Sequence, residues 1–230
     1  HYQPLPGAGG GRGGLGIAAV PGNTAPAPGT PWASPGTYTV RLTVNGKSRT
    51  QPITVRQDPR VTTPPAVMQE VYSLTDAMYF GAVQAQAALP GVTSLREQVA
   101  ALGPRASGSV AEALARFDAE LAALQGPPAP AAGAPGGAPA GAGQRPGGAQ
   151  SPAAPPSPES LPGVAASLSG LMNLLQGADV TPTAIQREAL LAARLKAQEV
   201  LGRWQALSTT GLTALNEVLR GAGLGALTLR

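Results

Sequence analysis

The 230-residue sequence contains no cysteine and a single histidine, His1. The absence of cysteine excludes disulfide bonds, thiolate zinc sites and thiol catalysis. Because the single histidine is His1, we expect no Ser-His-Asp relay, and a metal site built from several histidines is excluded. The carboxylate pairs Asp118 with Glu120 and Glu70 with Asp76 fall on predicted helix surfaces, where solvated charge is a commoner explanation than acid–base catalysis. We therefore expect no enzyme activity, no catalytic residue, no metal and no cofactor.

Aromatic residues are also scarce, with two Trp, four Tyr and two Phe. A core must therefore come from Leu, Val and Ala, which favours helices. The formal net charge is +4, but the arginines are scattered without aromatic residues between them. Nucleic-acid binding needs clustered phosphate contacts, so we do not expect it. The uncharged stretches 77–95 and 160–178 contain Pro, Gly, Gln and Ser, and their apolar residues recur at helical spacing, so we expect no transmembrane span.

The strongest structural pattern is a β-hairpin over residues 37–56. Polar and apolar residues alternate from Thr37 to Val44, and Asn45-Gly46 supplies the two positive-φ positions of a type I′ turn. An isolated hairpin is marginally stable in water, and a strand pair with one apolar face typically belongs to a sandwich of about seven strands. We therefore predict an Ig/fibronectin-like partial β-module whose apolar face another component of an assembly covers.

Two hairpin residues depart from the strand pattern. Arg49 is predicted to pair with Leu42 on the apolar face, either with its stem over the sheet and its head in water, or against an acidic partner. Pro52 cannot donate a ladder hydrogen bond, so we expect the return strand to be an edge, or its backbone to face outward there. Residues 1–60 carry six basic groups and one acidic group. The candidate partner contacts are an exposed tryptophan in a Pro-rich loop and four hairpin cations: Trp32, Arg41, Lys47, Arg49 and Arg56.

Helical patterns follow the hairpin over residues 61–125. We predict one helix from Thr63, as N-cap, to Leu89, ended by Pro90-Gly91. Capping boxes at Ser94 with Glu97 and at Ser109 with Glu112 predict two more. The last has the clearest heptad spacing in the chain, through Val110, Leu114, Phe117, Leu121 and Leu124.

Helical patterns resume over residues 159–230. Three helices are predicted: one from Leu161, one from a Thr181 cap and Pro182, and a short closing helix. Their apolar stripes run through Val164, Leu168, Leu171 and Leu175, then Leu190, Ala193, Ala197, Val200, Trp204 and Leu207, and finally Leu212, Leu215 and Leu219.

The predicted fold is α+β, with the hairpin followed by an antiparallel bundle of four or five helices. A segment of ten Pro, eight Gly and ten Ala among 33 residues interrupts the bundle and cannot form a core. The predicted divisions are a Gly/Pro-rich arm at 1–36, a hairpin module at 37–60, helical parts at 61–125 and 159–230, and the Pro/Gly/Ala-rich extended segment at 126–158.

The string from Pro35 to Lys47, continuing through Gln51-Pro52 to Asp58-Pro59-Arg60-Val61, resembles a known module. It is similar to the β-module near the C-terminus of large bacterial extracytoplasmic proteins with sortilin-like or BNR-repeat propellers. Gly177-Ala178-Asp179 with Pro182, and Arg203-Trp204, resemble the helical tail of those proteins. No Asp-box of the Ser-x-Asp-x-Gly-x-Thr-Trp kind occurs in these 230 residues, so the resemblance does not imply hydrolase activity.

Three functions fit these patterns. The first is a non-catalytic structural or interaction subunit outside the cytoplasm, peripheral to a membrane, that braces a larger protein assembly. Labels in the resembling family connect one version of it to a photosynthetic reaction-centre and antenna complex. The alternatives are the C-terminal fragment of a secreted propeller glycosidase-like protein and a carbohydrate-binding module.

The ends and arms of the chain give two further expectations. The chain begins with His1, which leads us to expect a processed N-terminus or a fragment. The segments 1–36 and 126–158 are expected to act as extended straps on partner subunits.

Overall fold

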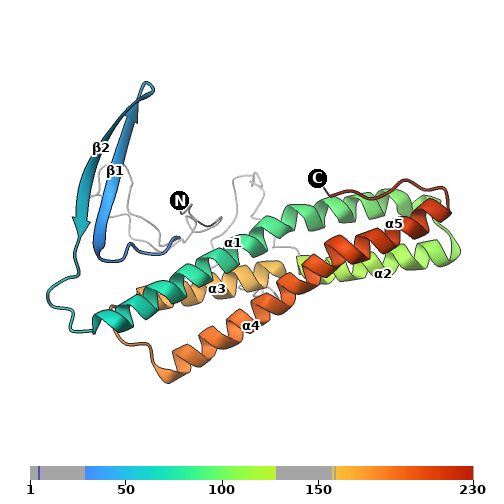
Figure 1. Cartoon of the computed structure of the whole chain (residues 1–230). Coiled ribbons are helices and arrows are strands. Elements are labelled where there is room, and N and C mark those ends of the chain that lie inside the picture. Colours follow the sequence, from blue (N-terminus) through green and yellow to red (C-terminus); the bar gives the residue numbers. More distant parts are fainter. Residues whose placement is uncertain (1–4, 6–28, 128–156, 158, 230) are drawn as a thin grey trace, which may run out of the picture. The chain divides into compact units, whose positions relative to one another are not determined.

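A computed structural model describes Leu5, residues 29–127, Ser157 and residues 159–229. The fold is mixed and mostly helical, with one antiparallel pair of strands in the described part of the chain. Most of the predicted arm 1–36 and of the predicted segment 126–158 lies outside the described residues. The elements in chain order are β1 (Gly36–Val44), β2 (Lys47–Val55), α1 (Pro65–Leu102), the 3-10 turn η2 (Gly103–Arg105), α2 (Gly108–Gln125), α3 (Leu161–Gln176), α4 (Ala184–Ala206), the π-helical turn η3 (Leu207–Gly211) and α5 (Leu212–Gly221) (Figure 1).

The chain forms two compact units. Unit 1 comprises residues 1–83 and 167–195, and unit 2 comprises residues 84–166 and 196–230. The boundaries fall inside α1, α3 and α4, so each of these helices contributes residues to both units. The predicted helical parts 61–125 and 159–230 are likewise distributed over both.

The predicted hairpin is confirmed in unit 1. Asn45 and Gly46 have φ angles of 49° and 76°, the two positive values that a type I′ turn requires. The antiparallel register runs from Val44 opposite Lys47 to Gly36 opposite Val55, and it pairs Leu42 with Arg49 as the sequence predicts. Every residue of β1, and every residue of β2 before Val55, is exposed. The hairpin therefore forms on its turn and its ladder with almost no burial.

Helix α1 is longer than predicted. It runs 38 residues from Pro65 to Leu102 and contains Pro90, so the predicted end at Leu89 is wrong. Ser94 lies inside the helix and its hydroxyl accepts a hydrogen bond from Gln98 Nε2 at 3.2 Å, so the predicted capping box there is also wrong. Buried residues recur at spacings of three or four along the whole helix, through Met68, Val71, Thr75, Met78, Ala82, Ala85, Ala88, Val92, Leu95 and Val99.

This stripe explains why one proline does not end the helix. An interior proline costs about 3 kcal/mol, whereas burial of each large apolar side chain contributes about 1.5–3 kcal/mol. Val92, Leu95 and Val99 all follow Pro90 and are all buried, so continuing the helix is favourable. Thr63 is not the N-cap, because α1 begins at Pro65 and Pro64 precedes it; the Thr63 hydroxyl donates to the Asp179 carbonyl at 2.6 Å.

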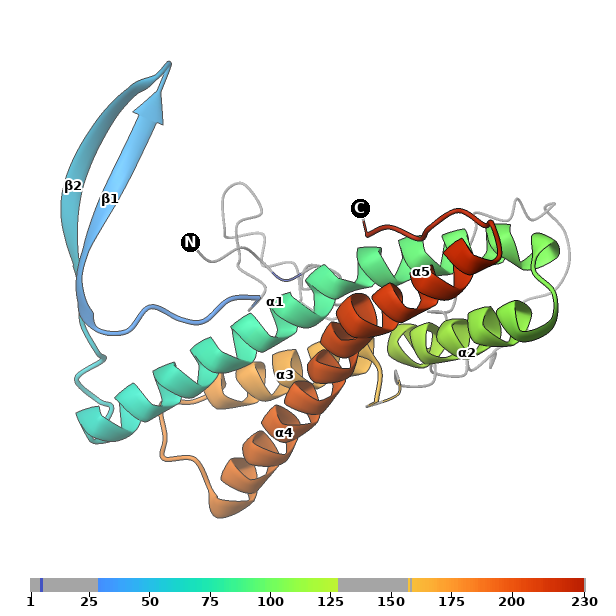
Figure 2. The same cartoon turned by 45° about the vertical axis from the view of Figure 1, so that its right-hand side comes forward.

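In unit 2, α2 and α5 bring the predicted heptad stripes together. Leu114, Phe117, Leu121 and Leu124 are buried on α2, as are Leu212, Leu215 and Leu219 on α5. The two helices lie side by side along residues 84–102 of α1 (Figure 2). Helix α2 begins at Gly108 after Ser107, so the predicted capping box at Ser109 and Glu112 is wrong by two residues.

Trp204 packs in unit 2 as its place in the predicted stripe suggests. A Cβ atom added to Gly91 would lie 2.9 Å from Cζ2 of the Trp204 indole. Gly91 therefore gives the ring room against α1. This is the physical role of a glycine that, next to Pro90, predicted a helix end.

Helix α4 starts later than predicted and does not stop before α5. Thr183 and Gln186 form a capping box, in which Thr183 N–H donates to Gln186 Oε1 at 2.8 Å and Gln186 N–H donates to Thr183 Oγ1 at 3.2 Å. Thr181 is therefore not the cap. The π-helical turn at Leu207–Gly211 joins α4 to α5 without a break, so the predicted closing helix continues its predecessor.

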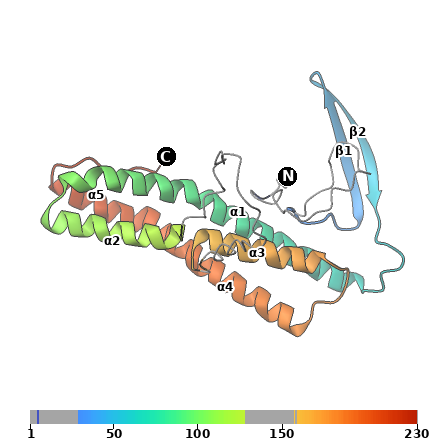
Figure 3. The ribbon, with the colours of Figure 1, turned by 180° about the vertical axis from the view of Figure 1, so that it is seen from behind.

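Helix α3 has the predicted start and a shifted stripe. Leu161, Val164, Leu168 and Leu175 are buried, but Met172 takes the buried position predicted for Leu171. In unit 1, α3 packs beside α1, where a Cβ atom on Gly81 would lie 2.8 Å from Leu168 Cδ1 (Figure 3). Small residues on α1 thus allow close helix approach.

Phe117→Ala tests the core of unit 2. The ring is 6% exposed, so its removal should lower the free energy of unfolding by about 3–5 kcal/mol in urea denaturation. Phe80→Ala is the control, because Phe80 is 48% exposed and has an edge contact with Tyr79, which predicts a loss of about 1 kcal/mol. A loss below about 1 kcal/mol for Phe117→Ala would mean that the stripe is not core.

Gly126→Ala tests the end of α2. Gly126 has a φ of 73°, and an added Cβ would lie 2.8 Å from Cβ and Oγ of the fully buried Ser160. We expect a loss of more than about 1 kcal/mol in the same denaturation assay. Gly202→Ala is the matched control, since no atom lies within 4 Å of its added Cβ, and it should stabilise α4 by up to about 1 kcal/mol. Equal effects of the two substitutions would contradict this account.

Candidate functional site

The apolar face of the hairpin is the largest exposed apolar feature of the strands. Directly opposed residues share a face of an antiparallel pair, so the register places Ile53 beside Tyr38. We define the apolar face as Tyr38, Val40, Leu42, Val44 and Ile53, which are 38–64% exposed. Clustered apolar side chains in water mark interaction surfaces more often than single ones do. This face therefore has the character of a contact surface.

Four cations accompany the apolar face. Lys47 and Arg49 lie on it, opposite Val44 and Leu42, whereas Arg41 lies on the other face opposite Thr50. Residues 36–57 include no Asp or Glu. Arg56 follows β2, and all four cations are exposed. Within the described ranges, none of the salt bridges involves them. The hairpin thus presents a positive field without internal compensation, which favours an acidic partner.

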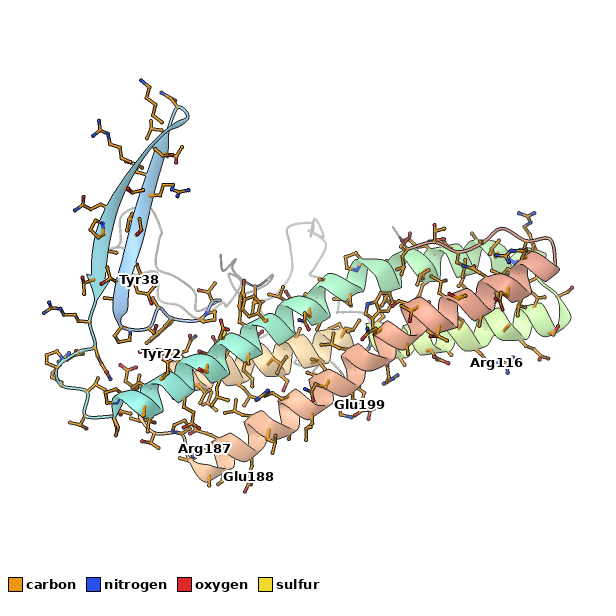
Figure 4. The ribbon with its side chains drawn as sticks, viewed as in Figure 1. Tyr38, Tyr72, Arg116, Arg187, Glu188 and Glu199 are labelled. Carbon is orange, nitrogen blue, oxygen red and sulfur yellow. The ribbon has the colours of Figure 1, made fainter. Side chains whose placement is uncertain are left out.

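Trp32, the fifth predicted contact, lines a cavity of about 530 Å³ in unit 1, and this cavity shares Tyr38 with the apolar face. Three of the eight aromatic residues of the chain line it, namely Trp32, Tyr38 and Tyr72. We call it the aromatic cavity. Its walls come from the segment before β1, from Tyr38 of β1 and from α1, and Figure 4 labels the two tyrosines. The polar residues of the lining are Ser34, Gln69, Ser73 and Asp76.

Gln176 holds the loop that carries Trp32. Its buried side chain accepts a hydrogen bond from the backbone N–H of Trp32 at 2.7 Å and donates one to the backbone carbonyl of Thr30 at 3.4 Å. On the other side, the Tyr38 hydroxyl donates to the Ser34 carbonyl at 2.6 Å. These bonds fix the backbone around Trp32, whose side chain remains 52% exposed.

Tyr72 differs electrostatically from an ordinary surface tyrosine. Partial burial raises the pKa of its phenol, and the nearby Asp179 carboxylate and Tyr38 raise that pKa further. The neutral phenol is therefore the form in the cavity wall over the physiological pH range. It can donate a hydrogen bond but carries no charge.

One carboxylate of each predicted pair, Asp118 and Glu70, is engaged in an ion pair. Asp118 accepts from Arg96 Nε at 2.9 Å, and this hydrogen bond raises the pKa of Arg96. Glu70 lies 3.0 Å from Arg187. Arg96 and Asp118 also border a cavity of about 350 Å³ in unit 2, whose other lining is mostly apolar. Both acidic groups thus have a structural explanation.

The described residues contain no group of three or more His, Cys, Asp or Glu side chains arranged to hold a metal ion. None of their helices combines the length and the apolar character needed to cross a membrane.

Comparisons with known proteins give no match. No protein-family model matches the chain, and searches of curated proteins and of solved structures find nothing similar to it. The resemblance to propeller-associated modules therefore stays a prediction, and the site is interpreted from its own geometry.

The sequence identified the exposed side chains but not what positions them. Trp32 and the hairpin cations stood out by composition and alternation. Gln176 and Tyr72 did not, because their roles depend on partners far away in the sequence. The one available clue was a glutamine directly after Leu175, at the end of an apolar stripe.

Gln176→Leu tests the positioning of Trp32. Loss of the amide removes both hydrogen bonds to the loop, so the Trp32 backbone amide should exchange with deuterium at least about tenfold faster. Asn173→Leu is the control, because Asn173 is an exposed residue of the same helix. Unchanged exchange at Trp32 in Gln176→Leu would show that another contact holds the loop.

Proposed function

We propose that the chain is a non-catalytic structural subunit that binds a larger protein assembly through its β-hairpin. The observation that carries this proposal is a hairpin of two nine-residue strands with an apolar face open to water. A two-stranded hairpin alone is marginally stable. Covering the face would stabilise the hairpin and remove its apolar side chains from water.

The hairpin fits the role of an incomplete module. Its apolar face corresponds to the inner face of one layer of an Ig/fibronectin-like sandwich, and the assembly would supply the opposing layer. An antiparallel bundle of four or five helices would carry the hairpin. Lys47 and Arg49 border the face, so electrostatic attraction favours a partner with carboxylates around an apolar centre.

The location is part of the same proposal. The resemblance to extracytoplasmic proteins supports a periplasmic or cell-surface subunit, extrinsic to a membrane. A photosynthetic reaction-centre and antenna complex is its narrowest version, and the family labels alone support it. The predicted straps 1–36 and 126–158 would add contacts to the same assembly.

Carbohydrate binding is the second candidate function, and the aromatic cavity favours it. Aromatic faces stack on the apolar faces of sugar rings, while side-chain amides and hydroxyls bond sugar hydroxyls. Trp32 and Tyr72 supply such faces, and Gln69 and Ser73 supply such polar groups. This candidate predicts that function depends on Trp32 and not on the apolar face of the hairpin.

The experiment measures recovery of the assembly with the affinity-tagged chain from the cells that make it. The double variant Leu42→Asp and Arg49→Glu should lower recovery at least about tenfold, because it places charge on the apolar face and reverses one cation. Arg116→Glu is the charge control, since Arg116 is exposed on α2 (Figure 4), and it should recover the assembly normally.

Trp32→Ala separates the two candidate functions in the same assay. The structural-subunit proposal predicts that the hairpin double variant has the larger effect. Carbohydrate binding is the better account if three results occur together. Trp32→Ala abolishes recovery of the assembly, added oligosaccharide lowers the recovery obtained with the unmodified chain, and the hairpin double variant assembles normally.

A further inference from the structure

We infer that the partner adds an extended β-strand to the outer edge of β1, and that this strand is apolar on one face and acidic on the other. The inference rests on the proposed function, because it specifies how the hairpin would bind the assembly. Three features of the hairpin carry it, namely the phase of its ladder, the position of its proline and its charge.

The ladder phase follows from the turn. In a two-residue hairpin the pair that flanks the turn, here Val44 and Lys47, exchanges hydrogen bonds, and hydrogen-bonded pairs then alternate with non-hydrogen-bonded pairs. Thr39 opposite Pro52 is therefore a non-hydrogen-bonded pair. Proline has no N–H, so its presence at that position independently agrees with this phase. The backbone groups that point away from the hairpin belong to Thr37, Thr39, Arg41 and Thr43 on β1 and to Ser48, Thr50, Pro52 and Thr54 on β2.

The two outer edges consequently differ. All four outward-facing positions on β1 have an N–H donor beside their carbonyl acceptor. The β2 edge lacks a donor at Pro52, in the middle of its outward-facing set, and proline is a known protection against edge pairing. The edge of β1 is therefore the one that can accept a full ladder. Its nine residues are all exposed.

The side chains define the chemistry of the added strand. Beside β1, one face of the new strand would extend the apolar face at Val40 and Leu42, so it needs apolar residues there. Its other face would lie beside Arg41, where a carboxylate would form a cross-strand ion pair. Arg41 is the cation of β1 on this face, and the four cations in 36–57 have no acidic residue among them, so an acidic strand is complementary to the hairpin. A second copy is disfavoured, because it would bring two such sets of cations together.

Hydrogen–deuterium exchange on the free chain and on the purified native assembly tests the inference. The amides of Thr37, Thr39, Arg41 and Thr43 should exchange rapidly in the free chain and at least about a hundredfold more slowly in the assembly. The amides of Ser48, Thr50 and Thr54 should remain fast in both. Protection of β2 amides alone, or no added protection on β1, would overturn the inference while leaving the proposed function intact.

Protection of the β1 amides already in the free chain would also overturn it. That result would point to pairing of the β1 edge within the chain. Protection that appears only in concentrated free chain would point to a second copy.

A matched pair of proline variants provides the second measurement. Thr39→Pro removes an outward N–H from β1, and Thr50→Pro removes one from β2, with both positions in non-hydrogen-bonded pairs on the polar face. Thr39→Pro should reduce recovery of the assembly at least about tenfold, and Thr50→Pro less than about twofold. Neither variant removes a hydrogen bond of the hairpin's own ladder, because the N–H groups at both positions point away from it, as at Pro52.

The outcomes separate the two proposals. Equal effects of the two proline variants, combined with loss of assembly in the Leu42→Asp and Arg49→Glu variant, would mean that the hairpin binds through its face and not through an added strand. Normal assembly of that face variant and of both proline variants would contradict the proposed function and this inference together.

Discussion

The continuous apolar stripe of α1 is the constraint on which both units depend. It supplies Met78 and Ala82 to unit 1 and Val92 and Leu95 to unit 2, each fully buried. A chain with so few aromatic residues cannot fill space with large rings, so its helices must approach closely. Gly81 against Leu168 and Gly91 against Trp204 provide that closeness. Without the stripe, Pro90 would divide the helix, and each unit would lose one wall of its core.

The hairpin and the helices are stabilised by different interactions. The helices are stabilised by burial, whereas β1 and β2 hold their register through the Asn45-Gly46 turn and the ladder while exposing Leu42 and Val40. A sequence that maintains an alternating apolar face without covering it carries a surface that favours association. The proposed function follows from this contrast, because each helix buries an apolar stripe whereas the strands bury almost none of their apolar side chains.

Local chemistry made the hairpin and the α2 stripe predictable from the sequence. Asn-Gly specifies its turn by itself, and the spacing of Leu114, Phe117 and Leu121 specifies a buried face whatever its partner is. Helix ends were predicted less well. Pro90 was overridden by burial on both sides of it, and Thr183 proved to be a stronger cap than Thr181 because Gln186 completes its box.

The residues of the candidate site likewise fall into those that local sequence predicts and those that it does not. The exposed cations and Trp32 could be found from alternation and composition, since exposure is a local property. The aromatic cavity could not, because it forms where α1 meets β1 and the segment before it, and Gln176 reaches that segment from α3. Such contacts depend on tertiary packing, which spacing alone does not specify.

Site-specific photo-crosslinking tests the central claim most directly. A benzophenone amino acid at Leu42 lies in the middle of the exposed apolar face, and one at Arg116 lies on the exposed surface of α2. In the native assembly, illumination should join position 42 to one defined partner subunit with higher yield than position 116. An assembled chain that forms no adduct from position 42 would show that the hairpin face stays in water, and would contradict the account.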